Sequence, residues 1–315
     1  MPLIAVEIEG PVNGPIVLNQ GGSAVLNVLG KSVVVDPNVA FVSAAQPGSV
    51  STPTAKLTLA QLADPTPFPG RTQAGFDGAV VIVKGHFDPS TGTISVARVS
   101  KPGNQGNLPF EEMPSIEIQP YETVLVGPCS RNAPGNFQVA GVPVQILPDV
   151  TTNPRLPGLP PETEEGFRID LSSVNINAQT AVEGYFGNSG VFHAFRIQAP
   201  GTLLSKAPQI SIQRATAKQH GNRWELGVRG FITRLHLPAG SPDQTVRVFQ
   251  RVGGTSQHLK TVKVSLPPAG QTARWDFKLQ LPPMATPPTT IFAAYDSAPG
   301  PIRPEAQLEV EIIAK

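Results

Sequence analysis

The sequence GKSVVVDPNV at Gly30–Val39 returns later in the chain as GVPVQILPDV at Gly141–Val150. Both copies follow the pattern G-x-x-V-x-[V/I]-x-P-[N/D]-V. Apolar residues alternate in each copy, which is the period of a β-strand with one buried face, and a proline followed by Asn or Asp ends the strand. A strand and turn that occur twice predict a module that occurs twice.

A second pair of segments supports the duplication. VKGHF at 83–87 is echoed by VEGYF at 182–186, and an alternating strand follows each of them after a turn. The two echoes come in the same order in both copies, with a segment of variable length and charge between them. We therefore predict two related β modules of about five strands each, joined by a polar, Pro- and Gly-rich linker.

The pattern V-x-G-x-[F/Y], a Gly-containing turn and an alternating strand together resemble the short OB-like repeats of bacterial proteins. The residues that carry this resemblance are Val83, Gly85, Phe87, Gly92, Val182, Gly184, Phe186 and Gly190. The resemblance implies that each module is a small Greek-key barrel, and it brings no catalytic residues with it.

The last third of the chain has a different pattern, with seven short alternating segments separated by turn residues. These segments are Ile210–Thr216, Trp224–Thr233, Thr245–Val252, Leu259–Leu266, Ala273–Leu281, Thr289–Asp296 and Ala306–Ile313. Their number and spacing predict an antiparallel sandwich. The Trp-x-Leu-x-Val-x-Gly strand from Trp224, the Val-Arg-Val-Phe strand and the Trp-Asp-Phe strand from Trp275 resemble a bacterial immunoglobulin-like domain without a disulfide, so both tryptophans are expected in the core.

The predicted fold class is therefore all-β, with two OB-like barrel repeats and a C-terminal immunoglobulin-like sandwich. The expected domains are residues 1–100 and 121–199 for the barrels, 101–120 for the linker and 200–315 for the sandwich. One short helix is predicted at Thr54–Asp64, where leucines and alanines give a rough apolar face.

Composition agrees with many short strands, because 30 glycines and 35 prolines make up about a fifth of the 315 residues. The single cysteine, Cys129, excludes an intramolecular disulfide and is expected to be a small apolar residue. No run of apolar residues is long enough for a membrane span, and no signal peptide follows Met1. We expect a soluble chain that is either cytoplasmic or exported without a cleaved signal.

The net charge of +1 hides an asymmetry along the chain. Residues 1–200 hold 10 Lys and Arg against 16 Asp and Glu, whereas residues 201–315 hold 14 against 7. Opposite charges in separate parts of one chain favour electrostatic pairing, within a molecule or between copies. The acidic, Tyr- and Trp-poor barrels argue against single-stranded nucleic acid, which binds to basic grooves with aromatic platforms.

No motif in the sequence indicates catalysis, a metal or a cofactor. The five histidines lack the close spacing of zinc sites, and nucleotide-binding and hydrolase fingerprints are missing. The acidic run Glu162, Glu164 and Glu165 lacks the spacing of a calcium loop, so we expect a solvated acidic loop. We predict no catalytic residue, no cofactor and no metal ligand.

Three functions stay open at this point. The first is a non-enzymatic structural protein whose acidic front and basic rear bind head to tail, in a cell-surface layer, an appendage or a virus particle. The second is a module that binds a polysaccharide or a protein through the variable segments Phe41–Thr72 and Thr151–Gly166. The third is a hydrolase with its site at a domain junction.

The first hypothesis places the contact on alternating basic residues of the sandwich, which an outer sheet face would display, and on the acidic run of the second barrel. The candidate interface residues are Arg229, Arg234, Arg247, Arg251, Lys260, Lys263, Glu162, Glu164 and Glu165.

Overall fold

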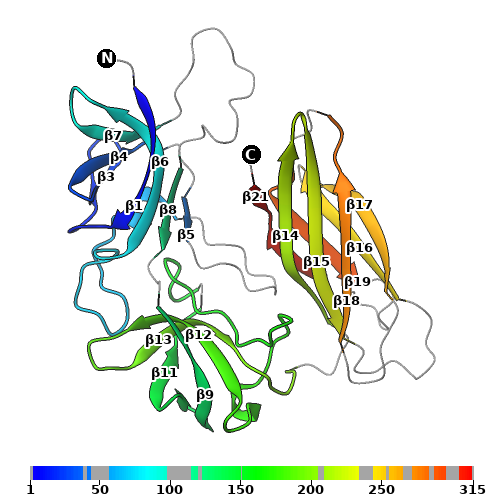
Figure 1. Ribbon diagram of the computed structural model, residues 1–315. Helices are drawn as coiled ribbons and strands as arrows, with labels where there is room; N and C mark the ends of the chain where they lie inside the picture. Colours follow the sequence, from blue (N-terminus) through cyan, green and yellow to red (C-terminus); the bar gives the residue numbers. More distant parts are fainter. Residues whose placement is uncertain are drawn as a thin grey trace.

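The computed structural model describes residues 3–37, 41–43, 57–97, 115–119, 123–149, 151–204, 209–233, 244–252, 255–264, 272–283, 287–295 and 305–313. Within these residues the chain forms two β modules and a β-sandwich, so the all-β prediction is confirmed (Figure 1). The helices in this part of the chain are too short to cross a membrane.

The first module is an 8-stranded sheet and not the closed barrel that was predicted for residues 1–100. Its strands are β1 (Ile4–Pro11), β2 (Val17–Leu18), β3 (Ala24–Val28), β4 (Lys31–Val35), β5 (Phe41–Ser43), β6 (Val80–Asp88), β7 (Thr93–Val96) and β8 (Ser115–Gln119). Neighbouring strands follow the order β2-β3-β4-β7-β6-β8-β5, and β1 pairs with β6. The long strand β6 therefore holds three partners: β1, β7 and β8.

The second module is a closed barrel. Its strands are β9 (Thr123–Ala133), β10 (Asn136–Val139), β11 (Val142–Ile146), β12 (Gln179–Phe186) and β13 (Phe192–Gln198). They close in the order β10-β11-β13-β12-β9, and a short 3-10 helix, η2 (Leu171–Ser173), lies in the segment before β12.

The two modules share the same pairing of five strands. Strands β1, β3, β4, β6 and β7 of the first module correspond to β9, β10, β11, β12 and β13 of the second. Val33 pairs with Ile94 in the parallel ladder of β4 and β7, and Val144 pairs with Phe192 in that of β11 and β13. These are the residues that the sequence repeat aligns, so the two modules share a register as well as a connection order.

The glycine that opens the repeated stretch belongs to a hairpin turn. Leu29 and Gly30 between β3 and β4 have φ angles of 52° and 74°, and Ala140 and Gly141 between β10 and β11 have 50° and 80°. Two successive residues with positive φ make the turn that matches the twist of antiparallel strands, and glycine adopts this conformation at little cost.

Gly85 in VKGHF and Gly184 in VEGYF are required because the backbone of a neighbouring strand passes close to them. A Cβ at Gly85 would lie 2.6 Å from the carbonyl oxygen of Ser95, and one at Gly184 would lie closer still to the carbonyl oxygen of His193. Ser95 and His193 occupy equivalent positions on β7 and β13. Backbone of the neighbouring strand thus fills the space of a side chain in both modules.

Two local predictions need correction. The helix predicted at Thr54–Asp64 is only α1 (Leu59–Leu62), whose N-cap Thr58 and third residue Gln61 form a capping box; residues 54–56 lie outside the described residues. The end of the predicted linker is the strand β8, which pairs with β6 and so belongs to the first sheet. Residues 101–114 of that segment are outside the described ranges.

The sandwich contains strands at all seven predicted segments. They are β14 (Ile210–His220), β15 (Arg223–Thr233), β16 (Gln244–Val252), β17 (Thr255–Val264), β18 (Thr272–Gln280), β19 (Thr290–Tyr295), β20 (Glu305–Glu309) and β21 (Glu311–Ile313). One sheet has the order β18-β15-β14-β21 and the other β17-β16-β19-β20. Trp224 and Trp275 lie in the core between them, as expected.

The cores of the two modules are not separate. The apolar cluster of the first module includes Leu147, Leu156, Tyr185 and Phe195 from the second. Side chains between the modules are therefore removed from water together, which favours folding of the two modules as one body.

Candidate functional site

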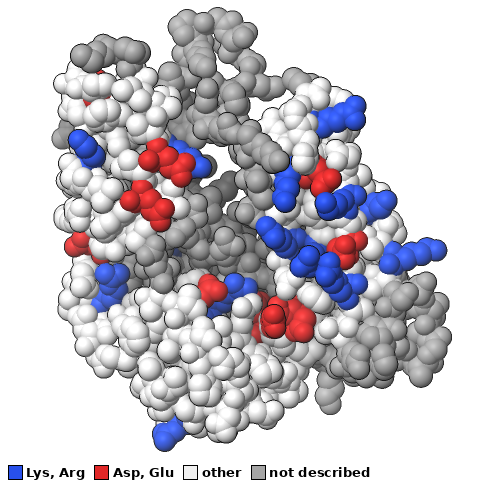
Figure 2. All heavy atoms as spheres, viewed as in Figure 1, with Lys and Arg blue, Asp and Glu red and all other residues white. Residues whose placement is uncertain are grey.

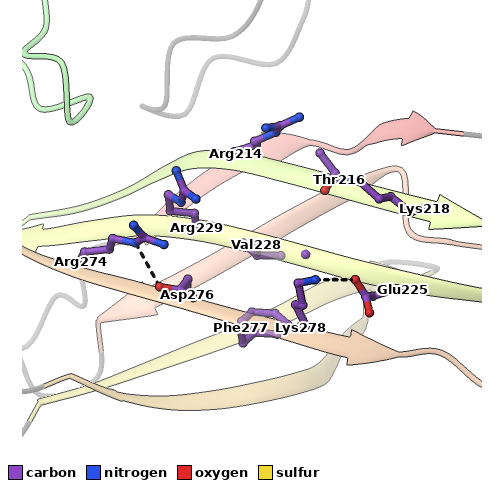
Figure 3. A pocket seen from close by; sticks show the side chains of 11 residues that line it. Arg214, Thr216, Lys218, Glu225, Val228, Arg229, Arg274, Asp276, Phe277 and Lys278 are labelled. Carbon is purple, nitrogen blue, oxygen red and sulfur yellow. Dashed lines mark hydrogen bonds and ion pairs between the residues drawn. The ribbon is translucent and has the colours of Figure 1, made fainter.

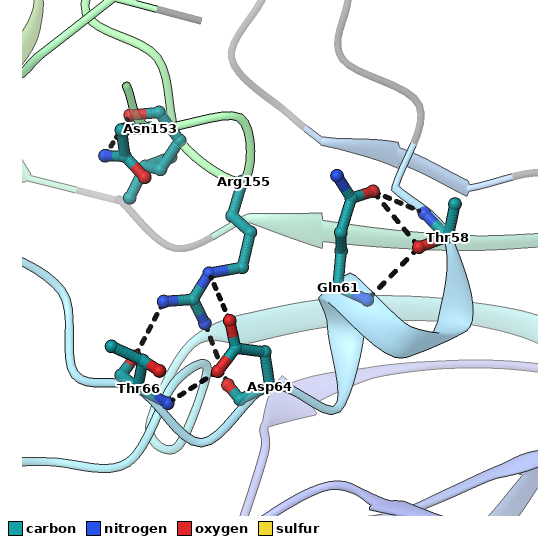
Figure 4. Close-up of polar contacts among 7 residues, drawn as sticks. Thr58, Gln61, Asp64, Thr66, Asn153 and Arg155 are labelled. Atoms are coloured by element: carbon teal, nitrogen blue, oxygen red, sulfur yellow. Dashed lines mark hydrogen bonds and ion pairs between the residues drawn. The ribbon is translucent and has the colours of Figure 1, made fainter. Parts of the chain in front are cut away.

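The variable segments, which were candidate binding loops, contact each other. Arg155 in the second segment donates hydrogen bonds to the backbone carbonyls of Asp64 (2.8 Å) and Thr66 (2.7 Å) in the first, and its guanidinium lies 4.6 Å from the ring centre of Phe68 (Figure 4). It also forms an ion pair with the Asp64 carboxylate at 3.4 Å. Arg155 is buried, so these contacts take up its hydrogen-bonding capacity inside the protein.

A second contact joins the first variable segment to the barrel strands. The Tyr185 hydroxyl on β12 donates a hydrogen bond to the Pro69 carbonyl at 2.8 Å, and the Tyr185 ring stacks on His193 at 5.3 Å. The backbone N–H of Asn188 donates a hydrogen bond to the Gly70 carbonyl at 2.7 Å. Burial raises the pKa of Tyr185 and lowers the pKa of His193. Burial thus favours the neutral form of both side chains within the contact.

The acidic run of the second barrel is not the solvated loop that was expected. Glu162 is buried, and its carboxylate accepts hydrogen bonds from Arg196 at 2.8 and 3.0 Å and from Gln198 at 3.3 Å. Burial raises the pKa of Glu162 although Arg196 opposes the shift. Glu162 therefore cannot contact a partner, and it is removed from the candidate interface.

The remaining members of the run are more accessible. Glu164 is exposed and Glu165 is half-buried, and the Glu165 carbonyl accepts a hydrogen bond of 2.6 Å from Ser211 at the start of β14. The acidic loop is thus attached to the sandwich through its backbone, which leaves its carboxylates available.

The predicted basic residues fall on opposite faces of the sandwich. Arg229 lies on the sheet β18-β15-β14-β21, whereas Arg247, Arg251, Lys260 and Lys263 lie on the strands β16 and β17 of the other sheet. All five are exposed, as alternation predicts. Arg234 lies outside the described residues.

Arg251 has a local role on its sheet. It forms an ion pair with Glu305 at 2.7 Å, and its guanidinium lies 4.2 Å from the ring centre of Phe292, which stacks on Phe249. These contacts cover an apolar cluster of Phe249, Phe292 and Ala294 on the outer side of the sheet. We therefore assign Arg251 to packing.

Arg229 belongs to a basic pocket of about 220 Å³ on the outer face of β14, β15 and β18 (Figures 2 and 3). The residues that line this basic pocket are Arg214, Thr216, Lys218, Glu225, Gly227, Val228, Arg229, Arg274, Asp276, Phe277 and Lys278. Five of them are cationic and two are anionic. The pocket therefore carries a formal charge of +3.

The two carboxylates of the basic pocket are engaged with neighbouring cations. Glu225 pairs with Lys278 at 3.0 Å, and the hydrogen bond from this ammonium lowers the pKa of Glu225. Asp276 pairs with Arg274 at 3.1 Å. Among the described residues, neither Lys218 nor Arg229 has a carboxylate within ion-pair distance. The excess positive charge is thus concentrated on β14 and β15.

The candidate set from the sequence contains only one residue of this pocket. Its charged members come from alternate positions on three strands: 214 and 218, 225 and 229, and 274, 276 and 278. Alternation on each strand was visible in the sequence, but the strand order that brings the three together was not. The glycine at 227, which makes the hollow, gave no separate signal.

Neither a reactive cysteine nor a metal site is found in the part of the chain that the structure describes. Cys129 is fully buried, and burial raises the pKa of its thiol, which disfavours the nucleophilic thiolate. The described ranges contain no group of three His, Cys, Asp or Glu residues placed to hold a metal ion.

Comparisons with known proteins add no assignment, since neither a family model nor a curated protein matches the chain.

Proposed function

We propose that this chain is a non-enzymatic assembly protein, in which two OB-like modules form a rigid spacer and an immunoglobulin-like sandwich makes contacts with other copies. The observation that carries the proposal is the basic pocket, where five cations from three strands surround a hollow in the sheet surface. Such a surface attracts acidic partners and orients their approach.

The connection order of the strands supports the finer fold assignment. In the closed barrel, the first three strands are sequential, the third pairs in parallel with the fifth, and the fourth pairs with the first. This is the arrangement expected of an OB-like, five-stranded Greek-key barrel. In the sandwich, two four-stranded sheets enclose Trp224 and Trp275 without a cysteine pair, which suits a disulfide-free immunoglobulin-like domain.

The packing of the variable segments favours assembly over recognition by barrel loops. Arg155 of the second segment binds Asp64 and Thr66 of the first, so these residues are used in the contact between the segments. A recognition loop needs donors and acceptors that remain free for a ligand. We therefore place recognition on the sandwich and treat these segments as the connection between the barrels.

The test is the molar mass in solution, measured by size-exclusion chromatography with light scattering across a range of protein concentrations. Contacts between unlike charges weaken as salt screens them. We expect assemblies larger than one chain at about 50 mM salt and dissociation at about 500 mM salt. A monomer at every concentration and salt would contradict the proposal.

A further inference from the structure

A buried histidine, His193, lies where the two β modules meet. Its side chain is only 5% exposed, and the ring of Tyr185 on β12 stacks on the imidazole. The first module covers this pair, because the Tyr185 hydroxyl binds the Pro69 carbonyl and a Cβ at Gly70 would overlap the His193 Nε2. The imidazole is therefore part of the contact between the modules.

Two glycines, one from each module, enclose the edge of the imidazole. A Cβ at Gly187 would lie 2.7 Å from the His193 Nε2 and 3.0 Å from the Gly70 carbonyl oxygen. The backbone N–H of Asn188 binds the same carbonyl at 2.7 Å. The ring thus occupies a narrow slot between Gly70 and Gly187, and the slot exists only while the loop around Gly70 is docked.

The other ring nitrogen of His193 has no partner in the slot. Its Nδ1 is buried and makes no hydrogen bond among the described residues. A neutral imidazole carries one N–H, whereas an imidazolium carries an N–H on both nitrogens. Protonation would therefore place a charge and an unpaired donor inside the contact, and both are costly to bury.

The second module offers no charge that would stabilise an imidazolium in the slot. No carboxylate in the described ranges forms an ion pair with His193, and its cross-strand neighbour on β11 is the neutral Gln145. Glu183, which precedes Tyr185 by two residues on β12, pairs with Arg196 at 3.3 Å. The carboxylate on the neighbouring strand is thus already used.

The first module brings a positive charge to the same place. The Arg71 guanidinium lies 5.8 Å from the centre of the Tyr185 ring, and it donates a hydrogen bond to the Asp77 carbonyl at 3.1 Å. Burial favours neutral Tyr185 because it raises the pKa of the phenol, and burial lowers the pKa of His193. The docked contact therefore takes up a proton less readily than an exposed imidazole does.

We infer that His193 is a proton-sensitive latch between the modules, which keeps loop 69–71 docked while the imidazole is neutral and releases it when the imidazole is protonated. An exposed imidazole takes up a proton near about pH 6.5. The docking contribution is thus fully present above this pH and is lost as pH falls. The Arg155 contacts contain no histidine, so they keep the modules connected when the loop opens.

The backbone N–H of Asn188 reports the docked state, because its hydrogen bond to the Gly70 carbonyl crosses the contact. Its hydrogen exchange is measured by NMR on the full chain at pH 7.5 and 5.5, relative to the intrinsic rate at each pH. Uptake of one proton predicts an open population that is about tenfold larger at pH 5.5. Opening of the loop is local, so this amide should exchange faster than the amides of the β9–β12 ladder at both pH values.

Three variants identify the source of the pH response. His193→Gln replaces the imidazole by an amide that takes up no proton, so the tenfold increase should vanish. His86→Gln is the control, since it removes the other histidine with a buried Nδ1 that lacks a described partner, and it should keep the increase. Thr72→Cys with Asn188→Cys places a disulfide where the two side chains already meet at 3.0 Å, and oxidation should suppress opening at both pH values.

The oxidised cysteine variant provides the test even if His193→Gln does not fold, because it leaves the imidazole unchanged. A tenfold increase that persists in either of these two variants, or that is lost in His86→Gln, would overturn the latch. Exchange of the Asn188 amide only at the rate of the β9–β12 ladder, or without a pH response in the unchanged protein, would also overturn it. None of these outcomes depends on self-association, so the proposed function is tested separately.

Discussion

The two modules share a five-strand frame, yet only the second closes by a continuous ladder. In the second module β9 pairs with β10 from Ala133 to Cys129. In the first, the corresponding strands are joined by the single bridge of Val12 and Val28, next to a hydrogen bond from the Asn13 amide to the Asn27 carbonyl. The first module instead extends its sheet with β2, β5 and β8. The two modules thus share the frame and differ at its edges.

The same position of the frame also carries different chemistry in the two copies. His86 on β6 faces Ser95, and its counterpart Tyr185 on β12 faces His193. Tyr185 reaches the first variable segment through its hydroxyl, whereas the His86 Nδ1 is buried with no hydrogen-bond partner among the described residues. The second module therefore contributes the side chain that accepts the contact, and the first contributes the segment that packs against it.

The largest loss of stability is expected when Gly184, the glycine of VEGYF, is replaced. We expect Gly184→Ala to lower the free energy of unfolding by about 3 to 4 kcal/mol, because its Cβ would overlap the His193 carbonyl. Gly85→Ala should cost less, since the corresponding oxygen lies farther away. Denaturant unfolding measures both. Gly92→Ala, at a turn with open space, is the control and should cost about 1 kcal/mol.

The contact between the variable segments should contribute nearly as much. Arg155→Ala leaves the carbonyls of Asp64 and Thr66 without their donor in a buried site, and we expect a loss of about 3 kcal/mol in denaturant unfolding. Arg131→Ala, which removes an exposed arginine of β9, is the control. Similar stability of the two variants would contradict the role of Arg155.

A smaller effect is expected at Tyr185, where the substitution removes the hydroxyl and keeps the ring. Tyr185→Phe keeps the ring stacked on His193 and removes the donor to the Pro69 carbonyl, so we expect a loss of about 1 kcal/mol. The same change in an Arg155→Ala background tests whether the two contacts are coupled. Strict additivity would show that they act independently.

The smallest effect concerns pH. Because burial lowers the pKa of His193 in the folded state, the stability that this residue contributes is present above the pKa of the unfolded imidazole and is lost as pH falls below it. We expect the thermal midpoint to fall between about pH 7.5 and 5.5, and to fall less in His193→Asn. His258→Gln, at an exposed histidine, should keep the full pH dependence. Burial raises the pKa of Glu162 in the folded state, so the stability that this residue contributes is lost as pH rises, opposite to the contribution of His193.

Much of the frame could be predicted because it depends on local signals. Alternating apolar residues indicated the strands. Gly30 and Gly141 adopt positive φ angles, and Gly85 and Gly184 leave room for a neighbouring carbonyl, at equivalent positions in both modules. The sandwich strands were found for the same reason. The predicted helix was too long because apolar residues occur at helical spacing outside Leu59–Leu62, the helix that the Thr58 capping box begins.

The sites could not be predicted, because they depend on contacts between distant residues. Arg155 binds carbonyls about 90 positions earlier in the chain, and backbone carbonyls leave no mark in a sequence. Glu162 looked solvated because its partner Arg196 lies on another strand. The basic pocket needs the order β14, β15, β18, which follows from the sandwich topology and not from any single strand.

Hydrogen exchange by mass spectrometry on the full chain tests the central claim, that the variable segments join the two β modules into one body. Exchange is compared in β4 and β11, the two copies of the repeated strand, between the unchanged protein and Arg155→Ala. One cooperative body predicts acceleration by the same factor in both strands, about 100-fold for a loss of about 3 kcal/mol. Acceleration confined to the variable segments, with β4 and β11 unchanged, would contradict the claim.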